Sequence, residues 1–242
     1  MVHYHSGSED MFLRWFVCTI EELESLSSKH FVVQNTKVPG GGFFEVQGIY
    51  YSQVDVELAF EVTGLEKSEA FDPSWTTNAQ ALCGQKRANV RGRAGPFGLY
   101  VLASANMEER TSVFFRIFKA QTKYKVLMCH DPTRSTLRTN MYKPTFAGFV
   151  DVDIPESGKI SRRSLLCSIN LLDNGFPCII ILTTLWWRAL GLGGTTCITS
   201  RVYSNTAIRR NAHLFVFNNG LANVKVSKLE AWEMKRPFMN GA

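Results

Sequence analysis

The sequence predicts an all-β protein built as a sandwich of two antiparallel sheets. Apolar residues recur with a period of two in about ten short segments, a period typical of strands and not of helices. Turns rich in glycine, asparagine and proline separate these segments. The alternation of strands with long helices that marks a parallel sheet is absent, so we expect antiparallel sheets packed face to face.

Three strands in the middle of the chain show this pattern most clearly. Residues 113–118 are apolar enough on both faces to predict a strand that is buried on both sides. Every second residue is apolar in residues 124–128. In residues 150–154, valine and isoleucine alternate with Asp151 and Asp153, so we expect one face of that strand to meet water.

The chain before these strands supplies further elements. Residues 1–14 are polar and have no period, which predicts a disordered leader, and a short helix is expected at residues 21–26. Short strands are expected at residues 31–34 and 43–47, with a Pro-Gly-Gly-Gly turn between them.

The clearest amphipathic strand is residues 53–62. Its apolar face consists of Val54, Val56, Leu58, Phe60 and Val62. Its other face is acidic and consists of Asp55, Glu57 and Glu61. We expect the acidic face to be solvated, as in a half-buried antiparallel strand, and not to hold a metal or serve catalysis.

The rest of the chain continues the series of strands. A long polar connection at residues 65–95 leads into a strand at residues 99–105. Asn218-Asn219-Gly220 favours a hairpin between the last two strands, because asparagine and glycine tolerate positive φ. The remaining strands are expected at residues 159–166, 196–203, 212–217 and 223–232.

Composition narrows the classes of function. A chain of 242 residues with 45% hydrophobic residues can build the core of one large all-β domain. The net charge is +6, but the basic residues are scattered, so we expect no nucleic-acid partner. The apolar run at residues 178–187 is too short for a membrane span, which needs about 20 residues, so no membrane partner is expected.

The six cysteines indicate neither a zinc site nor a cofactor site. They form no CxxC pair and do not cluster with histidines, so we expect no metal and no cofactor. The first residues lack the order of a signal peptide, so the sequence taken literally predicts a cytosolic protein.

No catalytic constellation can be assembled from the sequence. His130-Asp131-Pro132 lacks a nearby nucleophile and is expected to end a strand and begin a turn. Asp151 and Asp153 could bind a cation or bracket a glycosidic bond, but solubilising residues on an outer face are the simpler interpretation. Residues 173–175 lack the remaining ligands of a calcium loop, and His213 is interpreted as structural.

Many segments resemble the C-terminal part of plant acid invertases and fructan exohydrolases, in glycoside hydrolase family 32. The segments that carry the resemblance are FRIFKAQ, KVLMCHD, LRTNMYKPTFAGFVDVDI, TCITSRVY, AHLFVFNNG and VKVSKLEAWEMKRP. SKHFVVQN, DVELAFEV, FDPSW and GPFGLYVLAS extend it. The resemblance covers residues 20–166 and 195–236 and is closer to the cell-wall type than to the vacuolar type.

The resemblance implies a sandwich of the concanavalin or lectin type without the family's five-bladed propeller. The family hydrolyses β-fructofuranosyl bonds of sucrose or fructans with retention, using two carboxylates of the propeller. The motifs that hold those carboxylates are absent here, so no catalytic residue is carried over and the chain alone is expected to be inactive. The implied partners are the propeller domain with its substrate and a cell-wall polysaccharide.

The resemblance also implies a disulfide and a location. Cys83 and Cys129 match the positions of a disulfide in the family's sandwich. A disulfide there would place the protein in an oxidising compartment, which agrees with secretion to the cell wall and, less well, with the vacuole. The cytosolic prediction from the missing signal peptide disagrees with this.

Residues 167–194 depart furthest from the family. One set of codons for the family peptide Asp-His-Ser-Val-Val-Glu-Ser-Phe-Gly encodes residues 183–191 of this chain once its first base is lost. We therefore hypothesise a shifted reading frame after a retained intron at residues 167–182, and we expect local disorder or mispacking here. The expected organisation is a leader with a linker remnant (1–19), the sandwich containing this aberrant segment (20–236) and a tail (237–242). The alternative function is a non-catalytic carbohydrate-binding or partner-binding module.

Overall fold

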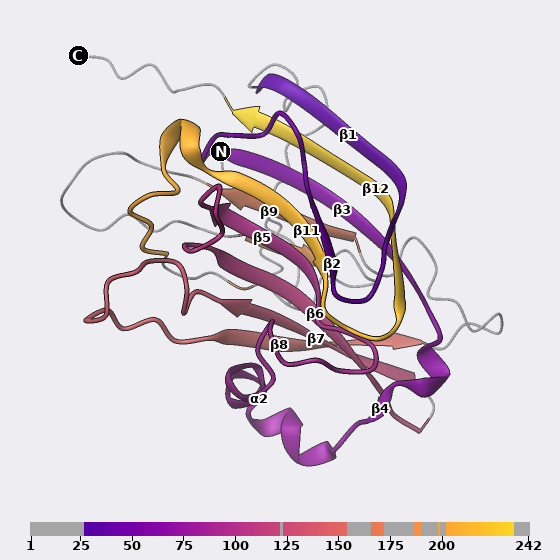
Figure 1. Ribbon diagram of the computed structural model, residues 1–242. Coiled ribbons are helices and arrows are strands. Elements are labelled where there is room, and N and C mark those ends of the chain that lie inside the picture. Colours follow the sequence, from indigo (N-terminus) through magenta and orange to yellow (C-terminus); the bar gives the residue numbers. More distant parts are fainter. Residues whose placement is uncertain are drawn as a thin grey trace, which may run out of the picture.

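Two antiparallel sheets face each other and enclose the main hydrophobic core, as the sequence predicts (Figure 1). The computed structural model describes residues 27–121, 123–153, 166–171, 186–189, 198 and 202–234. The expected helix at residues 21–26, the leader, and the strand expected at residues 159–166, except for its last residue, lie outside these residues.

The first sheet has five strands in the order β1-β12-β3-β9-β10. Their bounds are β1 Ser27–Val38, β12 Asn223–Met234, β3 Val54–Thr63, β9 Leu166–Leu171 and β10 Trp186–Ala189. The long strands β1, β12 and β3 lie side by side in Figure 1. The strands expected at residues 31–34, 53–62 and 223–232 are therefore confirmed, the first one longer than predicted.

The second sheet has the order β2-β11-β5-β6-β7-β8, and the two-residue strand β4 pairs with β6 in parallel, unlike the other, antiparallel pairs. Its strands are β2 Gly42–Glu45, β11 His213–Asn218, β5 Phe97–Ala103, β6 Thr111–Lys119, β7 Lys123–Asp131, β8 Phe146–Asp153 and β4 Glu69–Ala70. Short helices complete the described fold: the 3₁₀ turns Leu65–Lys67, Pro73–Thr77 and Arg209–Asn211 and the α-helix α2, Ala79–Gln85.

Strand β6 is buried on both faces, as its sequence predicts. Val113, Phe115 and Ile117 point into the core between the sheets. Phe114 and Phe118 point to the outer side of the second sheet, into a second apolar cluster. Each fully buried phenylalanine of this kind stabilises the fold by about 2 to 3 kcal/mol through removal of its surface from water.

The connection at residues 65–95 covers that outer side and builds the second cluster. Helix α2 lies against β7 and β8, below the second sheet in Figure 1. Asn78 caps it, with its Oδ1 accepting a hydrogen bond from the Ala81 amide at 2.8 Å. The sequence predicts a polar connection here, and the structure adds a short helix that carries Leu82 and Cys83 into the cluster.

Strand β3 confirms the predicted apolar face but only part of the predicted acidic one. The five apolar residues of its inner face are at most 2% exposed. On the other face, Glu61 is half-buried and accepts a hydrogen bond from Lys225, whereas Asp55 is buried at 5% exposure. Asp55 lies directly opposite Trp232 of β12 and between two flanking strands, so the expectation of a solvated Asp55 is wrong.

The Asn218-Asn219-Gly220 turn does not form a hairpin. It joins β11 in the second sheet to β12 in the first, so the chain crosses between the sheets at this point (Figure 1). Asn218 Nδ2 donates to the carbonyls of Val38 and Ala222, both at 3.0 Å. Its Oδ1 accepts from the Gly220 amide at 3.0 Å. The turn therefore differs from the expectation twice: none of its three residues adopts a positive φ, and the following strand joins the other sheet.

The strand expected at residues 196–203 is also wrong for its described part. Ile198, Val202 and Tyr203 have no regular secondary structure. The segment that follows is held by a buried carboxylate instead of a strand ladder, as shown below. The strands expected at residues 43–47, 99–105 and 212–217 are present with shifts of a few residues at their ends.

Candidate functional site

The histidine of the His130-Asp131-Pro132 segment is poorly suited to act as a general base, because it is a weak base and is shielded from solvent. His130 is fully buried, and this burial lowers its pKa to about 3. Its ring lies beside Phe146, with the two centroids 6.3 Å apart. The Asp131 carboxylate accepts a hydrogen bond from the Thr133 amide at 3.0 Å and so begins a turn. The segment ends a strand, as the sequence predicts.

The other acidic candidates give no site. Asp151 and Asp153 belong to β8 and pair with Lys125 and Lys123, but their side chains lie outside the described residues. Residues 173–175 lie outside them entirely. In the part of the chain that the structure describes, no group of three His, Cys, Asp or Glu side chains is placed to hold a metal ion.

His213 joins a small polar and aromatic surface at the β2 edge of the second sheet. Its Nδ1 lies 2.6 Å from Glu45 Oε1, and Tyr50 meets its ring edge to face with the centroids 5.1 Å apart. Phe215 links this ring to Phe43, which is 55% exposed. We call Phe43, Phe215, His213 and Tyr50 the ring row. Sequence patterns miss it because β2 and β11 are far apart in the chain.

Cys83 and Cys129 form a disulfide that ties α2 to β7. Their Cα atoms are 5.8 Å apart, and both residues are buried in the outer cluster. The bridge therefore fixes the connection at residues 65–95 to the outer face of the second sheet at the pairing that the family resemblance implies.

Arg116 of β6 holds the same connection from a second point. Its Nε donates to the Lys86 carbonyl at 2.8 Å, and its Nη2 donates to the carbonyls of Arg87 and Val90. Burial lowers the pKa of Arg116 to about 10, and the charge of nearby Glu69 opposes this shift. Arg116 thus satisfies the carbonyls that follow the end of α2.

Glu109 joins three loops at one end of the sandwich. Its Oε2 accepts hydrogen bonds from the Asn205 amide at 2.9 Å and from the amide and hydroxyl of Thr206, both at 2.7 Å. Ser204 Oγ also donates to Oε2, at 3.2 Å, and the Leu137 amide donates to Oε1 at 3.2 Å. Burial raises the pKa of Glu109, but these hydrogen bonds outweigh it and lower the pKa to about 2.

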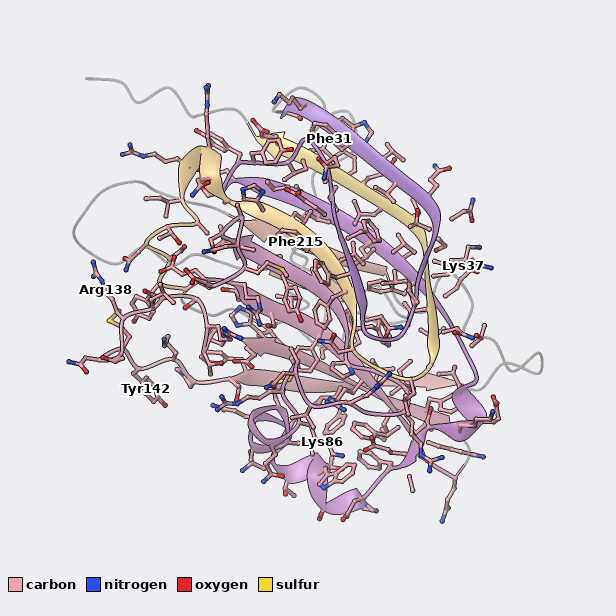
Figure 2. The ribbon with its side chains drawn as sticks, in the orientation of Figure 1. Phe31, Lys37, Lys86, Arg138, Tyr142 and Phe215 are labelled. Atoms are coloured by element: carbon pink, nitrogen blue, oxygen red, sulfur yellow. A yellow bond between two sulfur atoms is a disulfide. The ribbon has the colours of Figure 1, made fainter. Side chains whose placement is uncertain are left out.

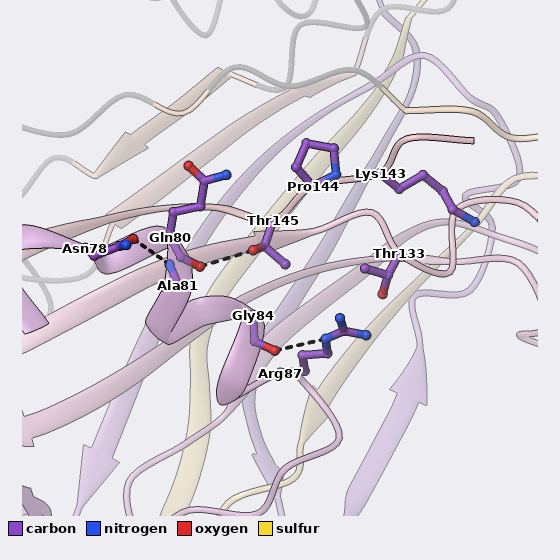
Figure 3. Close-up of a pocket in the computed structure, with 9 residues that line it drawn as sticks. All are labelled: Asn78, Gln80, Ala81, Gly84, Arg87, Thr133, Lys143, Pro144 and Thr145. Carbon is purple, nitrogen blue, oxygen red and sulfur yellow. Dashed lines mark hydrogen bonds between the residues drawn. The ribbon is translucent and has the colours of Figure 1, made fainter. Parts of the chain in front are cut away.

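An open pocket of about 450 Å³ lies between α2 and the β7–β8 connection (Figure 3). One wall comes from the helix segment and includes Asn78, Gln80 and Arg87. The opposite wall includes Thr133 and Lys143. The lining is polar, carries two cations, and contains neither a carboxylate nor an aromatic ring. Because residues 87 and 143 are distant in sequence, no local sequence motif predicts this pocket.

Comparison with known proteins places the fold among the plant fructosidases. The chain is 51% identical over 97% of its length to a β-fructofuranosidase, the insoluble isoenzyme 1 of Oryza sativa subsp. indica. It is 47% identical over 91% of its length to a fructan 6-exohydrolase of Triticum aestivum. The crystal structure of fructan 1-exohydrolase IIa from Cichorium intybus matches 90% of the chain with a TM-score of 0.70 and 38% identity. No family model matches the chain.

These matches define a β-sandwich of the glycoside hydrolase type. Over nearly its whole length the chain is similar to plant β-fructofuranosidases and fructan exohydrolases of glycoside hydrolase family 32, to whose C-terminal part it corresponds. It spans 38% of the length of the rice relative and 37% of the chicory structure. A maize relative, 51% identical, is a cell wall isozyme, so wall proteins are among its relatives.

Proposed function

We propose that this chain is the non-catalytic sandwich of a plant β-fructofuranosidase and does not hydrolyse sucrose or fructans by itself. The observation that carries the proposal is the coverage: nearly the whole chain aligns, yet it spans little more than a third of each relative. On this proposal the reaction belongs to a propeller domain, with sucrose or a fructan as substrate and the sandwich as its support.

The side chains that the structure describes support this assignment. Retaining hydrolysis uses two carboxyl groups about 5 Å apart that face the sugar in one pocket. Glu109 is buried at 1% exposure, and its carboxylate already accepts hydrogen bonds from loop residues. Glu69 forms an ion pair with Lys86 at 2.6 Å. The pocket beside α2 has no carboxylate in its lining. Its chemistry suits binding and not glycosidic bond cleavage.

We propose the cell wall as the location and a wall polysaccharide as a partner. Wall isozymes are among the relatives, the net charge is +6, and the Cys83–Cys129 disulfide suits an oxidising compartment. A basic protein is attracted to an acidic polymer through the sum of its charges. The vacuole is the second location that these features allow, and it fits the wall relatives less well.

A chimaera tests the proposed function. Residues 20–236, the proposed sandwich domain, replace the matching part of the rice relative, and sucrose hydrolysis is compared with that of the rice relative truncated before this part. We expect the chimaera to be stable and active and the truncated protein to lose stability. A chimaera that folds, as judged by circular dichroism, but whose propeller stays as unstable as the truncated protein would contradict the supporting role.

A free carbohydrate-binding module is the second candidate, and the ring row supports it. Exposed aromatic rings beside polar groups suit a sugar, whose faces are apolar and whose edges carry hydroxyls. Phe43 is 55% and Tyr50 37% exposed, and Tyr50 Oη donates to Gln47 Oε1 at 3.3 Å. Titration with sucrose and inulin, read by intrinsic fluorescence in the intact chain and in Phe43→Ala, decides between the two. Saturable binding that Phe43→Ala abolishes favours the module.

A further inference from the structure

We propose that the pocket between α2 and the β7–β8 connection binds the carboxylate groups of an acidic polysaccharide. Arg87 and Lys143 are the groups that contact the carboxylate. The inference rests on the proposed wall association. It goes further because it assigns the attraction to one defined site that binds uronic-acid carboxylates.

The charges of the pocket point to an anion. Arg87 and Lys143 both line it, and no lining residue is acidic. Arg134 and Arg138 belong to the same β7–β8 connection and are exposed, and Arg138 lies at the edge of the fold with its side chain directed outward (Figure 2). They add to the positive charge of this connection. Two acidic side chains adjoin that connection, Asp131 at the end of β7 and Glu109, but both are buried, and they accept hydrogen bonds from the Thr133 and Leu137 amides. The described surroundings therefore favour a negatively charged ligand.

The two cations are held in place before any ligand binds. Arg87 Nε donates to the Gly84 carbonyl at 3.0 Å, which fixes the guanidinium and leaves its terminal nitrogens directed away from the helix (Figure 3). Lys143 Nζ donates to the Thr136 carbonyl at 3.0 Å. A guanidinium with two terminal nitrogens available can grip a carboxylate with two parallel hydrogen bonds. Prior anchoring lowers the entropy lost on binding.

The framework around the cations is rigid. The disulfide joins α2 to β7, and Thr145 Oγ1 donates to the Gln80 carbonyl at 3.2 Å, so both walls are tied together (Figure 3). The Gln80 amide and the Thr133 hydroxyl add neutral hydrogen-bonding groups for sugar hydroxyls. A volume of about 450 Å³ lies in the range of small-ligand sites, about 300 to 1,000 Å³.

The pocket suits acidic sugars better than neutral ones. No aromatic ring lines this pocket, so the apolar face of a neutral sugar has no ring to pack against. A carboxylate instead obtains charge-assisted hydrogen bonds from both cations. Binding of this kind weakens as salt screens the charges.

Calorimetric titration of the intact chain with polygalacturonate tests the proposal, with fully methyl-esterified polygalacturonate as the neutral probe. The double variant Arg87→Gln/Lys143→Gln is compared with the control Lys67→Gln/Arg210→Gln, which removes two exposed cations outside the pocket and lowers the net charge equally. We expect the pocket variant to lose affinity at least about tenfold and the control less than about twofold. Equal losses in the two variants would show diffuse attraction only and overturn the proposal.

Two further measurements distinguish binding in this pocket from a general effect of charge. Arg87→Lys keeps the charge but removes the fork, so we expect it to weaken polygalacturonate binding while leaving thermal stability unchanged. Hydrogen exchange of the parent chain should show protection of residues 78–87 by polygalacturonate but not by the esterified polymer, and protection elsewhere alone would refute the site. The sucrose assay of the chimaera does not depend on this pocket, so failure here leaves the proposed sandwich role standing.

Discussion

Glu109→Gln should be among the most destabilising single substitutions in this chain. The substitution keeps the shape of the side chain but turns one acceptor oxygen into a donor. Oε2 faces the Asn205 amide, the Thr206 amide and the Thr206 hydroxyl, and Oε1 faces the Leu137 amide. Whichever way the new amide turns, an N–H meets another N–H in a buried place.

The magnitude follows from those contacts. Hydrogen bonds to a charged group contribute about 1.5 to 3 kcal/mol, and a buried donor left without an acceptor costs about 1 to 3 kcal/mol. Because the contacts share one carboxylate, they are not additive, and we expect a loss of about 3 kcal/mol in the free energy of unfolding. This is a large part of the about 5 to 15 kcal/mol that a typical domain has.

The dependence of stability on acid pH should also report on the Glu109 carboxylate. The pKa of Glu109 is about 2 in the folded protein against an ordinary value of 4.5, so its stabilisation is complete above pH 4.5 and is lost as the pH falls toward 2. Protonation is favoured in the unfolded chain over this range, so stability should fall with falling pH. The Gln variant, which has no proton to bind there, should show a shallower fall.

Urea unfolding followed by tryptophan fluorescence measures both effects, because Trp232 is fully buried. Glu109→Asp serves as the control that keeps the charge but shortens the reach. If Glu109→Gln unfolds within about 0.5 kcal/mol of the parent chain and shows the same acid dependence, Glu109 does not hold the three loops together.

Three further predictions concern the connection at residues 65–95 and the second sheet. Alkylation in denaturant followed by peptide mapping should find Cys83 and Cys129 unmodified without reductant and modified with it, and Cys83→Ala should lower stability by about 2 to 4 kcal/mol; modification of both cysteines without reductant would exclude the bridge. Arg116→Met should cost about 2 to 4 kcal/mol in urea unfolding, because it strips the donors from the Lys86 carbonyl and its neighbours, and Arg116→Lys should not restore the loss. NMR titration should find His130 still neutral at about pH 5, because its folded pKa is about 3 against an ordinary 6.5; a midpoint near 6.5 would place the ring in water.

Much of the fold could be predicted from periodicity alone. Strand β3 has the expected apolar face, and β6 is buried on both sides because both of its faces are apolar. The crossover at Asn218–Gly220 could not be predicted, since turn chemistry specifies a local backbone conformation but not the sheet that the next strand joins. Asp55 was placed in water because alternation does not show which strands flank it.

The sites were harder to predict because they join distant segments. Glu109 meets residues 204–206, and the pocket joins residues 78–87 to residues 133–145. Helix α2 had one local signal, the Asn78 cap, which the polar composition of the connection obscured. The Cys83–Cys129 pairing followed from the family resemblance and not from spacing, because six cysteines allow fifteen pairings. The shifted-frame hypothesis for residues 183–191 stays a prediction that the genomic sequence decides.

The most direct measurement is fructose release from sucrose and from inulin by the purified, disulfide-bonded chain, whose folding is first verified by cooperative urea unfolding. The proposed supporting role predicts no release above that of buffer at any pH between about 4 and 7, the span around the ordinary pKa values of carboxylates and histidine. Saturable hydrolysis that copurifies with the folded chain would contradict it, because this sandwich would then contain the catalytic carboxylates itself.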